Sequence, residues 1–133
     1  MSPTSCPCGQ SSTYDDCCGR FIAGKFDPAT AEELMRSRYS AYVKHAINYL
    51  VGTTHPSSRD GSLLANITST ADTYSWLSLQ VANIQGGTAE DNIGKVEFLA
   101  HYRSPDGQIG IHHERSRFKK YAGKWMYLDG ELM

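Results

Sequence analysis

All four cysteines of the chain lie within thirteen residues near its amino end, and this clustering constrains the fold more than any other feature. They occur as Cys6 and Cys8, then, after eight intervening residues, as the adjacent pair Cys17 and Cys18. Thiols that merely fill a core would be spread along the chain. Four thiolates can instead close a structural site around one tetrahedral Zn²⁺ ion, at about 2.3 Å from each sulfur. The spacing therefore predicts a zinc site.

Other uses of these cysteines remain open. Four cysteines allow two disulfides in three connectivities, and Cys17 and Cys18 could form a strained vicinal disulfide. Redox-active or inert thiols are the further alternatives. A disulfide framework belongs to secreted proteins, whereas residues 1–5 are short and polar, with no apolar run behind them. We favour zinc, and we expect it to be structural because four thiolates leave no open coordination position for water.

The order Cys6-Pro7-Cys8-Gly9, Tyr14, Cys17-Cys18 resembles the SEC-C motif, a small zinc-binding element found at the carboxyl end of the SecA translocation ATPase and in many other bacterial proteins. The resemblance implies that residues 1–26 form a SEC-C zinc-binding element, or zinc knuckle. In SecA the motif is associated with zinc and with contacts to a chaperone partner and the ribosome. It therefore implies that a protein partner docks through the knuckle.

Overall charge and hydropathy limit the kinds of partner that the protein is expected to bind and the cellular compartment in which it is expected to lie. The 133 residues have a formal net charge of −1, and Asp15 and Asp16 lie inside the cysteine motif. Neither feature favours nucleic acid as a partner. No apolar run approaches the roughly 20 residues needed to span a bilayer, so no membrane partner is expected. Thiolate zinc chemistry, together with the polar amino end, points to a reducing cytoplasm.

Residues 27–73 have a helical pattern. Thr30 and Glu33 have the spacing of a capping box and so predict the start of an amphipathic helix. Its apolar side chains recur at steps of three and four residues: Leu34, Met35, Tyr39, Tyr42, Val43 and Ala46. A break near His45 separates this helix from a short second one over 47–51. A third helix is predicted around 63–67.

From residue 73 onward the pattern changes to strands. Four strands are predicted over 74–84, 93–103, 109–121 and 124–129, with the turn sequence 105–107 between the second and third. In the first strand, Leu77, Leu79 and Val81 alternate and should share one face. Helices followed by strands with short turns indicate an α+β class. We expect about three helices packed on a curved four-stranded antiparallel sheet.

This order resembles the nuclear-transport-factor-2-like cone, a curved sheet wrapped around a helix to form a pocket. The resemblance extends along the chain to the YchJ family, which couples a SEC-C element to such a domain and has no characterised biochemical function. It is carried by the segments 34–42, 55–56, 96–98, 113–118 and 125–130. It implies a cone domain over residues 27–133 with a pocket for a small ligand, and a homodimer is one possible assembly.

Alternation in the third strand places Glu114, Ser116 and Phe118 on one face, which we expect to line the pocket. A carboxylate in an apolar cone needs a partner or has a raised pKa. Candidate partners are Arg36, Arg38 and His55. The further pocket candidates are Tyr39, Trp76 and Phe98, which equally suit a core. Outside the pocket, Glu97 is expected to pair with a cation on the third strand.

Two functions follow from these residues. In the first, the protein is a zinc-binding interaction or ligand-binding module, and Glu114 forms a buried ion pair that fixes the helix to the sheet. In the second, it is a small isomerase-, dehydratase- or hydrolase-like enzyme with Glu114, Arg38 and His55 as acid, anion clamp and base. No Asp–His pair occurs at a recognisable spacing, so the catalytic residues are not identified. An open cavity would favour ligand binding or catalysis, and one plugged by aromatic side chains would favour a scaffold.

Overall fold

The computed structural model describes residues 5–133, so residues 1–4 of the predicted zinc knuckle lie outside the described residues. Helices precede strands along the chain, as predicted. The helical elements are α1 (Cys18–Ile22), α2 (Ala31–Val43), α3 (Ile47–Gly52), the 3₁₀ turn η1 (Pro56–Ser58) and α4 (Leu63–Thr73). The strands are β1 (Ser75–Gly86), β2 (Ile93–Arg103), β3 (Ile109–Tyr121) and β4 (Lys124–Leu132).

Helix α2 begins at the predicted cap. The Thr30 hydroxyl accepts a hydrogen bond from the Glu33 backbone N–H at 3.1 Å, which satisfies one of the free donors at the helix start. The Glu33 carboxylate does not complete a capping box, because it accepts instead from Arg20 of α1 at 3.3 Å. The two helices are thereby joined at their polar surfaces. His45 adopts a positive φ of 56° between α2 and α3, where the break was expected.

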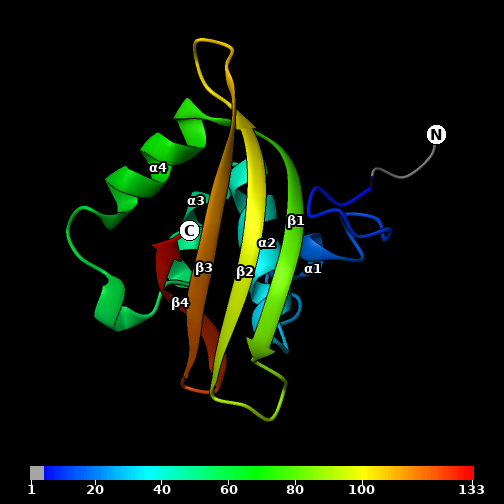
Figure 1. Cartoon of the computed structure of the whole chain (residues 1–133). Helices are drawn as coiled ribbons and strands as arrows, with labels where there is room; N and C mark the ends of the chain where they lie inside the picture. Colours follow the sequence, from blue (N-terminus) through cyan, green and yellow to red (C-terminus); the bar gives the residue numbers. More distant parts are fainter. Residues whose placement is uncertain (1–4) are drawn as a thin grey trace.

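The four strands form one antiparallel sheet in the order β1-β2-β3-β4, with each strand hydrogen-bonded to its neighbour in the sequence. Figure 1 shows them as long curved arrows, with the cysteine-bearing segment (blue) beside β1. The predicted α+β class and the curved four-stranded sheet are confirmed. The bounds predicted for the second and third strands match β2 and β3.

The alternation predicted for β1 was wrong at its beginning. The pairing of β1 with β2 shifts register between Trp76 and Ser78, so Leu77 has no partner in the ladder. Such a bulge exchanges the two faces of a strand. Leu77 is consequently 46% exposed, whereas Trp76 and Leu79 pack against the main core. The inner face of β1 therefore begins with the aromatic side chain of Trp76. Simple alternation with Leu77, Leu79 and Val81 would place this side chain on the outer face.

The main core lies between α2 and the inner face of the sheet. Leu34 and Met35 of α2 are buried with Val96 of β2 and Phe118 of β3. Trp125 of β4 closes one end, and its indole N–H donates to the Ala29 carbonyl at 3.1 Å. The four cysteines belong to this same core. The cysteine element is therefore packed onto the cone and shares its core.

A smaller cluster joins the helices to one another. Ala41 of α2, Leu50 of α3 and Ile67 of α4 are buried together. Within residues 5–133, none of the helices is both long enough and apolar enough to cross a membrane.

The bulge in β1 predicts different costs for two leucines of the same strand. Leu79→Ala removes core packing and should lower the free energy of unfolding by roughly 1–2 kcal/mol. Leu77→Ala, at an exposed position, should change it by less than about 0.5 kcal/mol. Urea denaturation followed by far-UV circular dichroism measures both. Equal costs, or a larger cost for Leu77→Ala, would contradict the register described above.

Candidate functional site

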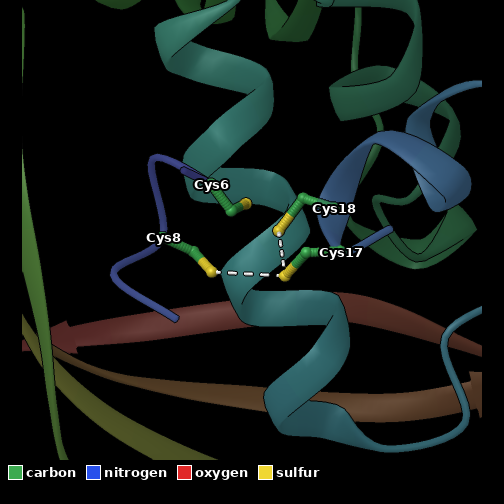
Figure 2. Close-up of side chains that lie close together, drawn as sticks. All are labelled: Cys6, Cys8, Cys17 and Cys18. Atoms are coloured by element: carbon green, nitrogen blue, oxygen red, sulfur yellow. Dashed lines mark hydrogen bonds between the residues drawn. The ribbon is translucent and has the colours of Figure 1, made fainter. Parts of the chain in front are cut away.

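The four cysteine sulfurs converge on one point beside α2. Any two of these sulfurs lie within 4.8 Å of each other, and all four side chains are buried (Figure 2). The Cys8 and Cys17 sulfurs are 3.7 Å apart, and those of Cys17 and Cys18 are 3.9 Å apart. A disulfide requires about 2.05 Å, so these pairs are not bonded. The four thiols lie close enough together to hold one metal ion.

The local backbone explains how two adjacent cysteines reach the same point. Cys17 lies at φ −119° and ψ −111°, outside the helical and extended regions, and Cys18 is the first residue of α1. The chain thus bends between the two side chains. The Tyr14 carbonyl accepts from the N–H groups of both Cys17 and Gly19. A Cβ on Gly19 would lie 2.7 Å from that carbonyl oxygen, so the turn requires glycine at this position.

The cysteine thiols differ in pKa because their sulfurs are crowded together. A hydrogen bond from Cys18 lowers the pKa of the Cys8 thiol to about 5. Burial raises the pKa of the Cys17 thiol to about 12. Further negative charges cannot accumulate in this water-excluded space without a counter-charge. A divalent cation would supply that charge and would displace the remaining thiol protons.

Helix α2 holds the cysteine segment through two polar contacts. The Arg36 Nη1 group donates to the Cys8 carbonyl at 2.8 Å, and its Nε group donates to Glu32 at 2.8 Å. The Ser40 hydroxyl lies 3.6 Å from the Cys6 sulfur, one turn further along α2. The cluster is therefore connected to the middle of α2.

A cavity of about 400 Å³ lies on another side of α2, between this helix and the sheet. Most of its lining is aromatic. Seven of the nine residues proposed from the sequence line it: Arg38, Tyr39, Trp76, Phe98, Glu114, Ser116 and Phe118. The aromatic side chains form walls and leave the interior open.

Arg36 and His55 do not line the cavity, contrary to the expectation from the sequence. Arg36 is directed to the cysteine segment, as described above. The His55 ring accepts from the Ser57 N–H at 3.1 Å and packs edge-on against Tyr121, with ring centroids 5.5 Å apart. It caps the 3₁₀ turn η1, and this local role holds its ring away from the cavity.

The sequence also led us to expect a direct ion pair between Glu114 and an arginine. No such pair occurs among the described residues. Arg38 Nη1 donates to the Leu50 carbonyl and the Thr53 hydroxyl, each at 2.8 Å. The guanidinium stacks on Tyr127, 4.6 Å from the ring centroid. The Tyr127 hydroxyl in turn donates to Glu114 Oε2 at 3.2 Å. An aromatic ring thus separates the two charges.

Glu114 has a different partner, which sequence reasoning missed. His112 Nε2 donates to Glu114 Oε1 at 2.8 Å, and the Ser116 hydroxyl donates to Oε2. Burial raises the pKa of Glu114, but the hydrogen bonds from His112 and Ser116 outweigh it and hold the pKa below its usual value. The available signal was the spacing of His112 two residues before Glu114 in a strand, which places both on one face.

On the opposite face of the sheet, Glu97 accepts from His113 Nε2 at 2.8 Å and lies 3.9 Å from Arg115. The contact with Arg115 is the expected pairing with a cation of the third strand.

Comparisons with known proteins agree with this architecture. The family model described as YchJ, middle NTF2-like domain, matches residues 30–130. A UPF0225 protein of Streptomyces coelicolor is 41% identical over 133 residues, covering 100% of this chain and 99% of that protein. A UPF0225 protein of Geobacter sulfurreducens is 38% identical over 125 residues, covering 94% of this chain and 77% of its own length.

Two solved structures are similar over the full arrangement, cysteine element included. The solution structure of RPA3114, a SEC-C motif containing protein from Rhodopseudomonas palustris, has a TM-score of 0.88 and 38% identity, covering 98% of this chain and 99% of that one. A SEC-C motif containing protein from Psychrobacter arcticus has a TM-score of 0.78 and 31% identity, covering 96% and 82%. With its cysteine cluster, its NTF2-like cone and these relatives, the chain belongs to the YchJ-type UPF0225 family.

Proposed function

We propose that this protein is a cytoplasmic small-ligand-binding protein whose fold is closed by a structural zinc ion. The observation that carries the proposal is the open cavity of about 400 Å³, which lies within the size range of small-molecule sites. A plugged cone would have favoured a purely structural scaffold. The exposed outer surface of the cysteine element, residues 9–12 and 15–16, is where we expect a protein partner to dock.

Zinc is the ion that the cluster fits best. A tetrahedral site with Zn–S bonds of about 2.3 Å has sulfurs about 3.8 Å apart. The 3.7 and 3.9 Å separations agree with this value. An all-sulfur donor set selects zinc over Mg²⁺ or Ca²⁺, which prefer oxygen. All four sulfurs are buried, so water has no access to the ion. Its role is therefore to hold residues 6–18 in place.

Ligand binding would depend on this zinc. Helix α2 contacts the cysteine segment through Arg36 and Ser40, and it contributes Arg38, Tyr39 and Tyr42 to the cavity wall. A short segment with few apolar side chains cannot hold this arrangement without the metal. Loss of zinc would therefore loosen one wall of the cavity.

A proton-transfer enzyme is the second candidate, and the His112–Glu114 pair favours it. Glu114 fixes the His112 ring with its Nε2 atom protonated. Within residues 5–133, no hydrogen bond involves the Nδ1 atom of this ring. A histidine oriented in this way by a carboxylate is suited to act as a general base. His112 thus replaces His55 as the base in the enzymatic hypothesis.

The zinc assignment predicts the metal content of two variants. The purified reduced protein should contain one zinc ion per chain by plasma mass spectrometry. Cys8→Ser removes one ligand and should lower the zinc content to less than about half, because three thiolates hold the ion far more weakly. Ser11→Ala, at an exposed position in the same loop, should keep the full content. Unchanged zinc in Cys8→Ser would falsify the ligand assignment.

The lowered pKa of Glu114 predicts a pH dependence of stability. A carboxyl group with a depressed pKa in the folded state stabilises the protein above the unfolded-state value, and this contribution is lost as the pH falls through the folded-state pKa. At pH 7, Glu114→Gln should lower the free energy of unfolding by roughly 1–3 kcal/mol, because the variant loses hydrogen bonds to a charged acceptor. The difference in the free energy of unfolding between the variant and the wild type, called the gap below, should narrow below about pH 4.5.

Urea denaturation of both proteins between pH 3.5 and 7 measures this gap. Glu131→Gln, on an exposed part of β4, is the matched control and should track the wild type throughout. A gap for Glu114→Gln that stays constant over this range would mean that the pKa of Glu114 is the same in the folded and unfolded states, which would remove the energetic basis of the His112–Glu114 pair.

A further inference from the structure

We propose that the cavity binds a small organic acid, whose carboxylate pairs with the free N–H groups of Arg38 and whose planar body packs among the aromatic side chains. This inference depends on the ligand-binding function proposed above and specifies the chemical class of the ligand.

The guanidinium of Arg38 has N–H donors that make no hydrogen bond within the described residues. A guanidinium carries five N–H donors in a fixed plane. The structure uses only Nη1, which donates to the Leu50 carbonyl and to the Thr53 and Thr54 hydroxyls. Among the described residues, no hydrogen bond is made by Nε or Nη2. Arg38 lines the cavity and is only 8% exposed, so the cavity is where a partner for these donors would lie. The Nε–Nη2 edge of a guanidinium matches the two oxygens of a carboxylate.

The charge of Arg38 also has no direct ion-pair partner. No ion pair joins it to a carboxylate anywhere in the described residues, and burial lowers its pKa, which shows that the site penalises the bare cation. Glu114 does not compensate it directly, because the Tyr127 ring lies against Arg38 and its hydroxyl contacts Glu114. Glu114 already accepts hydrogen bonds from His112, Ser116 and Tyr127. The group that the cavity lacks is therefore an anion that can pair with Arg38.

The remaining walls suit a planar apolar body. The Trp76 ring is surrounded by Tyr42, Tyr74 and Tyr102, with ring centroids 6.2, 6.1 and 5.6 Å away. Aromatic walls also attract organic cations. In this cavity the unpaired positive charge of Arg38 would repel a cation. Glu114 already accepts hydrogen bonds from His112, Ser116 and Tyr127. The aromatic side chains thus select for a flat ring, and Arg38 selects for its negative charge.

Three probes of the same shape separate the possible ligand classes: benzoate, benzamide and benzamidinium, which are anionic, neutral and cationic. Each is titrated into the zinc-loaded full chain by calorimetry and by ¹H–¹⁵N NMR of the arginine Nε–H groups. Benzoate should bind at least roughly tenfold more tightly than either analogue, since a charged bidentate pair is worth well over 1.4 kcal/mol. Benzoate should also shift the Nε–H signal of Arg38, assigned in the wild-type protein by triple-resonance NMR.

Arg38→Lys keeps a positive charge but lacks the planar edge, so it should weaken benzoate binding by roughly tenfold or more. Arg117→Lys, on an exposed part of β3 outside the cavity, is the control and should bind as the wild type does. The wild-type Nε–H shift decides the question even if Arg38→Lys folds poorly. Equal or tighter binding of benzamide or benzamidinium would overturn the proposal and leave the ligand-binding function standing. Absence of any shift in the cavity with all three probes would contradict both.

Discussion

The contact between the cysteine cluster and α2 is the constraint on which the rest of this structure depends. A helix of thirteen residues is bound to the cluster through Arg36 and Ser40 and forms a cavity wall with Arg38, Tyr39 and Tyr42. Because successive residues of a helix turn by about 100°, one short helix can present alternate side chains to two sites. The cysteine cluster and the cavity thus lie on two sides of one helix.

The same geometry explains where sequence reasoning about the site succeeded and failed. Strand alternation placed Glu114, Ser116 and Phe118 together, and all three line the cavity. Arg36 and Arg38 were both considered as partners of Glu114, but two residues apart in a helix they point in nearly opposite directions. Only Arg38 reaches the cavity. His112 was the missed partner, although the alternation that grouped Glu114 with Ser116 includes it equally.

Much of the fold was predictable because it rests on local patterns. The cap at Thr30, the break at His45 and the bounds of β2 and β3 each follow from a few neighbouring residues. The bulge at Leu77 was not predictable, because it depends on how β1 pairs with β2 over its whole length. The packing of the cysteine element against the cone likewise rests on contacts between distant residues, such as that of Arg36 with the Cys8 carbonyl, 28 positions away.

Hydrogen–deuterium exchange of the zinc-loaded and the chelator-stripped protein tests the central claim most directly. If the metal centre holds α2 in place, removing zinc should increase amide exchange in Ala31–Val43 as well as around the cysteines, with β2 and β3 remaining protected. Increased exchange confined to the cysteine segment, with α2 unchanged, would contradict the dependence of the cavity wall on the metal.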